Sequence, residues 1–482
     1  MKIKNKIFKH WEWITLFLFI SLYTVSLSYF SIQRHNAFYS GYDLSHMDQT
    51  IWNTLHGRFF SLTGDYGTIS RFSIHGDIIL ALLAPLYLIW DNVRAILIFQ
   101  SFALALGAIP IYLISFKLLK NKILALLLAA MYLLNPGMQW TNIYDFHPIA
   151  LVIPFLLSTF YCALTKKWRW YFAFLILSLM TKEEVGFTTM IMGGLLLIMF
   201  KEWKIGLITI AISGFWIFVV VRLIIPHYNI DHTYSYSSWY KIAEENIKST
   251  NLIEIPNELV RNYFVTIDTI PYYNILLREF AFLPLLGIPW ILLSLPELLI
   301  NIFSSHAQMR SIVLHYDSLM VPGLMISSIF TIYYLQIFFS KVKYLKKYSQ
   351  LSLYFITCVA LAIVIRVDYH YSPLPITPSC WCKTYRVTKN SIAFEKILQK
   401  IPKSASVTSS PEIAPHTTHR ENAYTLPIAT ASADFIAMSD QNRIIGDNNP
   451  KGFENELIKV LQGNDNFELV SHIHHYYLFK RK

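Results

Sequence analysis

Long apolar runs separated by short polar segments make up the chain as far as about residue 369. A helix that crosses a membrane needs about 20 apolar residues, and about 17 is the short end of the range. Several runs reach this length. They predict membrane spans at 13–32, 94–118, 123–141, 148–164, 205–226, 319–339 and 351–367.

Weaker apolar runs complicate the count. The runs 170–180 and 186–200 are short, and 280–303 is interrupted by three prolines. We expect this last segment to form a hairpin that does not cross, or one half of a pair of crossings. The run 78–90 is too short to cross and is expected to be re-entrant or to rest on the outer face. The pattern predicts an all-α polytopic membrane protein with about 10–12 spans or half-spans.

Composition and charge support a membrane location. Of the residues, 54% are hydrophobic and only 15% are charged, against roughly a quarter charged in soluble domains. The net charge of +11 falls in small groups at 2–9, 117–122, 166–169 and 341–347 rather than in one basic stripe, so no nucleic-acid partner is expected. Positive charge marks cytoplasmic loops. We therefore predict a multi-pass plasma-membrane protein whose N-terminus is cytoplasmic, with a large extracytoplasmic loop at 33–77 and an extracytoplasmic C-terminus.

After residue 369 the long apolar runs stop. Helix patterns at 392–401 and 453–462 alternate with short strand patterns at 405–409, 433–438 and 468–473. We predict two domains, a membrane domain at 1–368 and a soluble extracytoplasmic α/β domain at 369–482. The four cysteines form no recognisable disulfide framework, and Cys380 and Cys382 are too close for a usual zinc pair. We expect all four to be structural or incidental.

Two carboxylates, Asp43 and Asp48, follow the first predicted span. On a helix they would diverge, whereas a turn between Leu44 and His46 would bring both onto one cleft. Other polar residues join them on the extracytoplasmic face of the predicted topology, as a one-sided polar cavity would require, although polar loops explain each residue alone. These residues are His75, Asp77, Asp145, His147, Lys182, Glu183, Glu184, His306, His315 and Asp317.

Three short segments carry candidate chemistry. Asp145 and His147, two residues apart before a proline, suit a hydrogen-bonded pair or metal ligands, or a polar helix cap. Lys182 with either Glu183 or Glu184 would form an ion pair or bind a phosphate and a cation together, or these charges would simply end a helix. Arg222 lies in an apolar run close to its outer end, where it would contact a lipid phosphate or extend to the interface. Motifs for binding nucleotides are absent from the sequence, so no nucleotide cofactor is expected.

Several segments, taken in order, resemble an uncharacterised family of polytopic membrane proteins, domain of unknown function family 2079. The resemblance covers nearly the whole chain, with departures at Ser45 and at 76–78. It is carried by Tyr42-Asp43-Leu44, Asp48-Gln49, Trp52-Asn53, His75, Leu83-Ala84-Pro85-Leu86-Tyr87, Tyr144-Asp145-Phe146-His147-Pro148, Leu179-Met180-Thr181-Lys182-Glu183-Glu184, Leu295-Pro296-Glu297-Leu298-Leu299-Ile300-Asn301 and His315-Tyr316.

That family is similar in layout to membrane glycosyltransferases of the GT-C fold, which keep an essential acid in the first extracytoplasmic loop. The resemblance implies transfer of a sugar from a polyprenyl-phosphate donor to an extracytoplasmic acceptor, with membrane lipids as further partners. Asp43 is then the candidate base, and Asp48 its helper, with both as candidate ligands of a divalent cation. The candidate substrate-binding residues are His75, Asp145, His147, Lys182, Glu183, Arg222, His315 and Tyr316; of these, Lys182, Arg222 and His315 are the phosphate contacts.

Two other classes of function remain open. Transporters and flippases usually place their sites near the bilayer midplane on broken helices, whereas here the ionisable residues gather at one face and 280–303 is the only broken-helix candidate. A catalytically silent protein that binds a lipid-linked glycan would also fit, since a fold does not guarantee an activity. The sequence leaves open the sugar, the acceptor, metal dependence and the oligomeric state.

Overall fold

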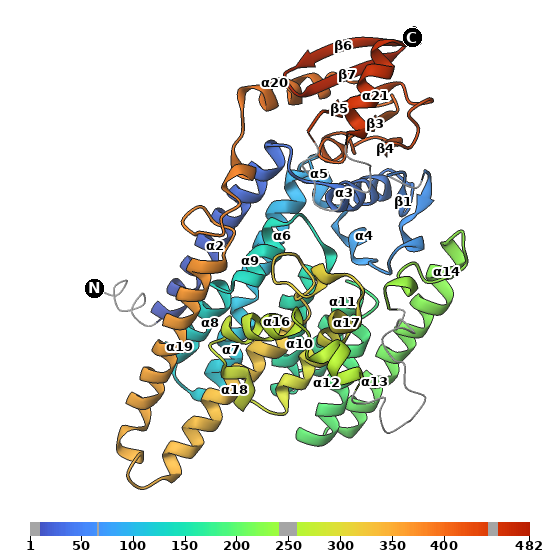
Figure 1. Ribbon diagram of the computed structural model, residues 1–482. Helices are drawn as coiled ribbons and strands as arrows, with labels where there is room; N and C mark the ends of the chain where they lie inside the picture. The colour runs from blue at the N-terminus through green and yellow to red at the C-terminus, as the bar shows by residue number, and fades with distance from the viewer. Residues whose placement is uncertain (1–9, 65–66, 241–257, 442–451) are drawn as a thin grey trace.

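The computed structural model describes residues 10–64, 67–240, 258–441 and 452–482. A bundle of helices fills most of the molecule, and a small sheet domain lies at one end of it (Figure 1). The helices of the bundle are α2 (Trp11–Asn36), α6 (Arg94–Leu106), α7 (Ala108–Leu119), α8 (Lys122–Leu133), α9 (Pro136–Ile143), α10 (Val152–Leu164), α11 (Trp168–Leu179), α12 (Val185–Met199), α13 (Trp203–Phe218), α18 (Met320–Lys341) and α19 (Ser349–Tyr371).

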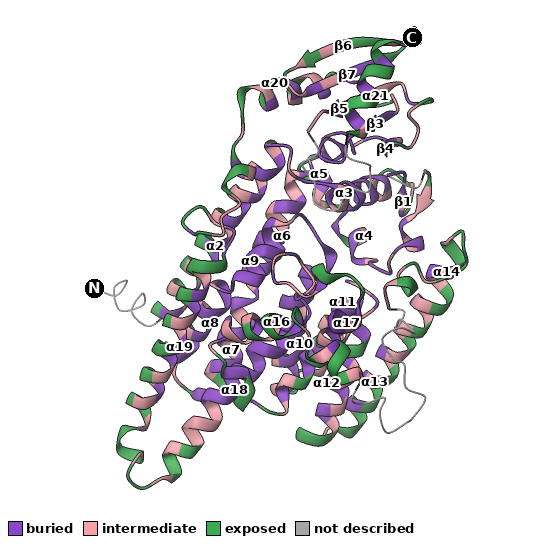
Figure 2. Ribbon diagram, in the orientation of Figure 1, coloured by how far each residue is buried: buried purple, intermediate pink, exposed green. Residues whose placement is uncertain are grey.

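Length and apolar composition mark many of these helices as membrane spans. Within the described ranges, five helices are long and apolar enough to cross a membrane, and there is a sixth if the bent pair α8–α9 is counted as one span. The residues 79–89, 148–164, 168–179, 185–199 and 290–303 form shorter apolar helices. Buried residues fill the centre of the bundle, whereas α2, α13 and α19 expose apolar side chains along their outer sides (Figure 2). The structure thus confirms the predicted all-α membrane fold.

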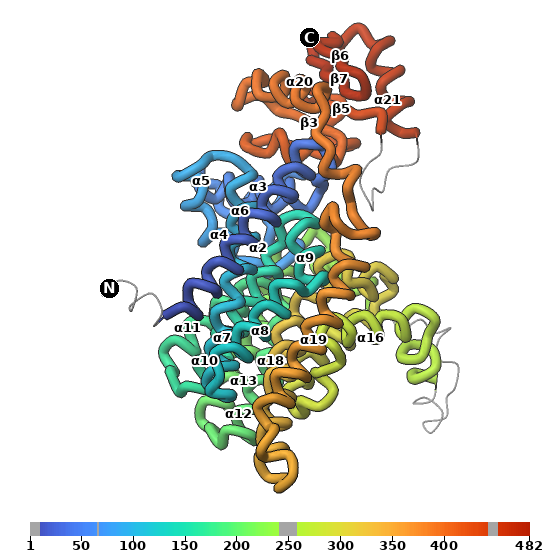
Figure 3. Tube along the Cα trace, turned by 90° about the vertical axis from the view of Figure 1, so that its left-hand side faces the viewer, coloured from blue at the N-terminus to red at the C-terminus, as the bar shows by residue number. Residues whose placement is uncertain are grey.

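The basic helix junctions lie together at the end of the bundle away from the sheet domain. Lys122 pairs with Glu12 at 2.7 Å, which holds the start of α2 beside the α7–α8 junction. Lys166 in the α10–α11 junction pairs with Glu202 in the α12–α13 junction at 2.6 Å. The α18–α19 hairpin projects from the same end (Figure 3). The predicted clustering of basic residues therefore holds for these junctions, while the group at 2–9 lies outside the described residues.

The proline-interrupted segment does not form one long helix. It consists of η7 (Leu283–Leu286), η8 (Trp290–Ser294) and α17 (Leu295–Phe303), which pack against α18. The interruption predicted from the three prolines is therefore confirmed, while the choice between a non-crossing hairpin and one half of a pair of crossings stays a prediction. The remaining short helices are α3 (Tyr42–Leu55), α4 (Ile79–Leu83), α5 (Leu86–Ile89), α14 (Ile225–Tyr228) and α16 (Thr269–Arg278), and a π-helical segment, η3 (Val219–Ile224), continues α13.

The C-terminal region forms a five-stranded mixed sheet in the order β4-β3-β5-β7-β6. Strands β3, β4 and β5 are parallel, whereas β7 runs antiparallel to β5 and β6. The sequence patterns predicted β3, β5, β6 and both helices but missed β4 and β7. The elements are α20 (Lys389–Leu398), β3 (Val407–Ser409), β4 (Ala423–Thr425), β5 (Phe435–Ser439), α21 (Phe453–Gln462), β6 (Phe467–Ile473) and β7 (Tyr476–Arg481).

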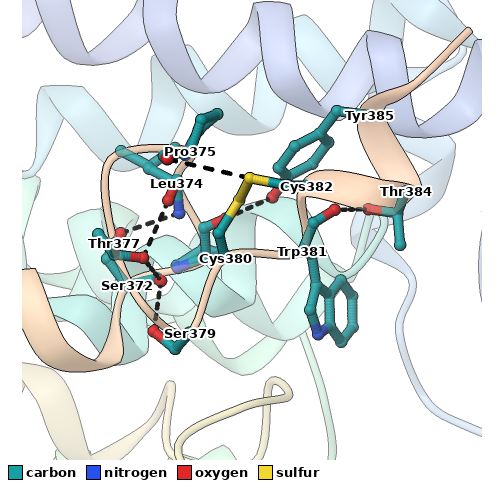
Figure 4. The surroundings of a disulfide bond; sticks show 11 residues. Ser372, Leu374, Pro375, Thr377, Ser379, Cys380, Trp381, Cys382, Thr384 and Tyr385 are labelled. Atoms are coloured by element: carbon teal, nitrogen blue, oxygen red, sulfur yellow. Dashed lines mark hydrogen bonds between the residues drawn. A yellow bond between two sulfur atoms is a disulfide. The ribbon is translucent and has the colours of Figure 1, made fainter.

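A disulfide joins Cys380 to Cys382 in the segment between α19 and α20 (Figure 4). The bond closes a short loop that contains only Trp381 between the two cysteines. The indole of Trp381 contacts that of Trp140 at the end of the bundle. No disulfide framework was predicted from the cysteine spacing, whereas the structure contains this one bond, so Cys380 and Cys382 are structural residues. Cys162 and Cys358 are free.

Candidate functional site

A cavity of about 450 Å³ lies between the bundle and the first loop. Helix α3, the α9–α10 and α11–α12 junctions, α13, and the segments before η4 (Ser237–Tyr240) and α18 contribute its wall. The polar and aromatic residues of the wall include Tyr42, Asp43, His46, Arg71, His75, Asp77, His147, Thr181, Lys182, Glu183, Glu184, Tyr234, Tyr236, Trp239, Tyr240, His315 and Tyr316.

One side of the cavity is apolar. Phe187 of α12, Ile217 of α13, Val221 of the π-helical segment and Ile300 of α17 line it. Helices α12 and α13 approach closely here, because a Cβ at Gly186 would meet Ile217 Cγ1 at 2.5 Å. Helix α13 exposes Phe215 and Phe218 on the outside of the bundle. The cavity thus has one charged wall and one apolar wall, and the apolar wall lies next to a helix with exposed apolar side chains. This arrangement suits an amphipathic ligand.

Asp43 enters the cavity from the first turn of α3. Gly41 is the N-cap of this helix, and its N–H donates to Asp145 Oδ2 at 3.0 Å. Asp145 also pairs with Arg34 at the end of α2. An acid in a first helical turn is favoured by the helix dipole. Although Asp43 lies deep in the fold, 43% of its side chain is accessible because it faces the cavity.

Two stacked histidines adjoin this carboxylate. His147 Nε2 lies 3.3 Å from Asp43 Oδ2, and the His147 and His315 rings stack with their centroids 3.8 Å apart. Burial acts to raise the pKa of Asp43, but the hydrogen bond and charge of His147 outweigh it and hold the pKa well below its usual range. Asp43 is therefore ionised at neutral pH. Burial also lowers the pKa of His315, so this imidazole is neutral.

A second group of polar contacts surrounds Glu183. Its Oε1 lies 2.9 Å from His75 Nδ1 and accepts a hydrogen bond from the Tyr234 hydroxyl at 2.9 Å. Its Oε2 accepts the Gly76 N–H at 3.1 Å. Burial would raise the pKa of Glu183, but the charge and hydrogen bond of His75 lower it. Glu183 is thus a fixed anion that orients His75 toward the cavity.

Two cationic side chains complete the polar wall, each with an acidic partner. Lys182 Nζ lies 2.6 Å from Glu184 Oε1, and the Arg71 guanidinium donates to Asp77 at 2.7 and 3.1 Å. Burial disfavours the ammonium of Lys182, but the negative charge of Glu184 raises its pKa well above the ordinary value. Lys182 therefore stays charged while lining the cavity, which allows it to contact an anionic ligand.

The structure brings most of the predicted site residues together. Asp43, His75, His147, Lys182, Glu183, His315 and Tyr316 all line this one cavity. They come from separate helix junctions that share the sheet-domain end of the bundle.

Three predicted residues lie elsewhere. Residues 42–55 form a helix instead of the turn that would have joined the two acids, so Asp48 faces away from Asp43 and is buried against the C-terminal domain. Asp145 is buried behind the cavity in its pair with Arg34. Arg222 is exposed on the π-helical segment and lines a separate surface hollow beside His227 and Tyr228. The expectation of a single site containing all ten residues is corrected accordingly.

Sequence reasoning missed several wall residues. Arg71 begins a short 3-10 helix, Arg71–Ser73, and no pattern in the sequence pointed to it. Only its hydrogen bonds to Asp77 show that its side chain is held in place. Tyr234, Tyr236 and Trp239 form an aromatic-rich stretch in the predicted outer loop, which was the available signal. The ring of Tyr236 stacks on His75 with centroids 4.8 Å apart. This stretch gives the cavity an aromatic surface.

A divalent cation held by Asp43 and Asp48 together does not fit this arrangement, because the two carboxylates point to different sides of α3. Among the residues that the structure describes, no group of three or more His, Cys, Asp or Glu side chains is arranged to hold a metal ion. The polar wall instead consists of acids and bases already paired with one another.

Comparisons with known proteins agree with this architecture. A family model described as "Predicted membrane protein (DUF2079)" matches residues 34–475. No curated protein matches the chain. Among solved structures, ArnT from Cupriavidus metallidurans bound to undecaprenyl phosphate has a TM-score of 0.53 at 10% identity, covering 97% of each chain. The apo state of the same protein has a TM-score of 0.50, also at 10% identity and with 97% of each chain covered. This likeness confirms the resemblance to the GT-C fold.

Proposed function

Because this chain belongs to the DUF2079 family of predicted membrane proteins and has a GT-C-like fold, we propose that it transfers a sugar from a polyprenyl-phosphate donor to a hydroxyl acceptor at the extracytoplasmic face. A solved neighbour with the same fold binds undecaprenyl phosphate, which supports a lipid-linked donor. The fold alone does not determine an activity, so the proposal depends on the cavity.

The observation that carries the proposal is the position of Asp43. Its ionised carboxylate faces a cavity with one apolar and one polar wall, beside a lipid-facing helix. The lipid chain of the donor would lie against Phe187, Ile217 and Val221. Its phosphate would then lie near Lys182, and the sugar would reach the carboxylate. A purely structural acid would be expected to face protein on all sides, yet almost half of this side chain is accessible.

The chain's residues support an inverting displacement. Asp43 accepts the proton of the acceptor hydroxyl while the hydroxyl oxygen attacks the anomeric carbon of the sugar. The bond between that carbon and the phosphate oxygen breaks, and its electron pair leaves with the polyprenyl phosphate. Lys182 stabilises the negative charge on the departing phosphate, and neutral His315 can donate one hydrogen bond to it. His147 holds the Asp43 carboxylate in place.

Purified protein in lipid nanodiscs tests this function directly. Incubation with a panel of polyprenyl-phosphate sugars and acceptor glycans should release free polyprenyl phosphate and extend an acceptor. Binding of a donor without release of polyprenyl phosphate across the panel would reject transfer and favour a silent glycan-binding protein.

One observation favours transport as a second candidate. Helices α8 and α9 meet at a 46° bend beside the buried carboxylates of Glu279 and Asp317. Gly137 at the start of α9 donates its N–H to Glu279 Oε1 at 2.9 Å. Broken helices with ionisable residues are typical of transporter sites. Movement of a lipid or solute in proteoliposomes, with no turnover of any donor, would support this candidate.

A further inference from the structure

Helix α3 is shared between the cavity and the C-terminal domain. Tyr42, Asp43 and His46 on one side line the cavity. Asp48 and Gln49, less than two turns further along, are buried at 0% and 1% accessibility and contact the segment that leads into β4. The same rigid helix therefore carries the proposed base and the docking surface of a domain more than 350 residues away in sequence.

Asp48 is surrounded by partners from two parts of the chain. Its carboxylate accepts hydrogen bonds from the hydroxyls of Tyr87 at α5 and Thr418 in the C-terminal domain. His419 Nε2 lies 3.1 Å from Asp48 Oδ1, and the opposite ring nitrogen lies 2.7 Å from Asp91 Oδ1. A buried carboxylate is costly unless it is paired. These contacts make the C-terminal domain a necessary partner of α3.

Gln49 adds a second connection through the first loop. Its amide nitrogen, Nε2, donates to Thr63 Oγ1 at 2.7 Å and to the Glu421 carbonyl at 3.2 Å. Thr63 Oγ1 in turn donates to the Ala423 carbonyl at 2.6 Å. The loop thereby binds the outer edge of β4, the first strand in the order of the sheet, and this fixes the position of the domain on α3.

Gly64 links this edge to the cavity wall. Its N–H donates to the Ala423 carbonyl at 3.1 Å, and its carbonyl accepts the Thr425 N–H at 3.1 Å, which adds a parallel bridge to β4. A Cβ at Gly64 would meet His46 Nε2 at 2.5 Å. Only a glycine allows the strand edge to approach His46 so closely. The sheet domain therefore packs, through one residue, against a side chain of the cavity.

We propose that the C-terminal domain is a positioning element of the catalytic cavity, and that Asp48 and Gln49 are the residues through which it fixes the helix carrying Asp43. Neither residue touches the cavity. Their role is to set the direction of α3 from the middle of the helix. The contacts of Asp145 with Arg34 and with the Gly41 N–H hold its N-terminal end. The proposed consequence for catalysis rests on the function proposed above, whereas the mechanical coupling does not.

Hydrogen–deuterium exchange of the peptide 42–55 in nanodiscs tests the coupling without substrate. Asp48→Asn and His419→Gln should each speed exchange in this helix by about tenfold, since local opening becomes easier when buried contacts are lost. His475→Gln is the matched control, because His475 pairs with Asp440 at 2.6 Å within the same domain but away from α3. If Asp48→Asn fails to accumulate, Gln49→Ala replaces it, since it leaves no buried charge unpaired.

Turnover of a lipid-linked donor tests the consequence. A displaced base lowers kcat by roughly 10- to 100-fold, while the KM for the donor should change by less than about threefold because the lipid and phosphate contacts remain. The control His475→Gln should keep both values. Unchanged exchange in the docking variants overturns the proposal whatever their turnover. If exchange becomes faster in the docking variants but the wild type turns over no donor, the mechanical coupling is supported and the proposed glycosyl transfer is rejected.

Discussion

The Asp43 carboxylate lies 3.3 Å from Nε2 of His147, on the ring that stacks against His315. This pairing lowers the pKa of Asp43. A base acts only when ionised, so the activity should fall at low pH as Asp43 is protonated. In His147→Gln the largest contribution to this lowering is removed, the pKa of Asp43 rises, and the acid limb of the pH profile of kcat/KM should move to higher pH. An acid limb that stays in place would contradict this pairing.

Lys182 is expected to contact the donor phosphate. Lys182→Gln removes a charged hydrogen bond worth roughly 1.5–3 kcal/mol, so kcat/KM for the donor should fall by roughly 10- to 100-fold. Lys166→Gln is the matched control, because this lysine also pairs with a glutamate but lies at the opposite end of the bundle. Steady-state kinetics with varied donor concentration would distinguish the two. Equal effects in both variants would argue against a phosphate contact at Lys182.

The contact between α3 and the C-terminal domain should depend on pH. Burial disfavours the charged form of His419, but the negative charges of Asp48 and Asp91 raise its pKa to about 9. Two further groups lie close by: Lys403 pairs with Asp91, and the ring of Tyr87 packs against the imidazole of His419. Since the folded pKa lies above the ordinary value near 6.5, this stabilisation is complete below about 6.5 and is lost as pH rises through about 9.

Limited proteolysis can measure that dependence. In the wild type, release of the C-terminal domain by the protease should become faster as the pH is raised from about 6.5 to about 9. In His419→Gln the release should be fast at both pH values, because the titrating group is gone. A variant that retained the wild-type pH dependence would show that another group is responsible.

The orientation of the bundle gives a prediction of its own. Loop 33–77 and the chain after residue 369 should lie outside the cytoplasm, because the basic junctions share the opposite end. Single cysteines introduced at Ser61 and Ser432, in a background with the native cysteines removed, should react with an impermeant thiol reagent in intact cells. Reaction only after permeabilisation would reverse the orientation.

The spans and much of the site could be predicted because both depend on local pattern. A run such as 351–367 is apolar over its whole length, which alone predicts a helix in lipid. Lys182 and His315 lie beside predicted span ends, and they were placed on one face because that arrangement keeps the lysine groups between the spans on the other. The basic groups around Lys122 and Lys166 were placed together at the opposite face for the same reason.

The remaining features depend on tertiary contacts. Nothing in the sequence from 42 to 53 decided between a turn and a helix, and the N-cap interaction of Gly41 with Asp145 crosses a hundred residues. Asp48 was predicted to assist Asp43, because nothing in the local sequence shows that its partner Thr418 lies 370 residues away. The short strand β4 is recognisable only through its pairing with β3 and its bridge to Gly64.

The most direct test of the account is the turnover of a polyprenyl-phosphate sugar by purified Asp43→Asn. The substitution keeps the size of the side chain but removes its charge and basicity. We expect normal membrane insertion and a rate roughly 10²- to 10⁴-fold below the wild type. Asp231→Asn, an exposed acid in the segment after α14, should retain the wild-type rate. A wild-type rate in Asp43→Asn would contradict the role of Asp43 as the catalytic base.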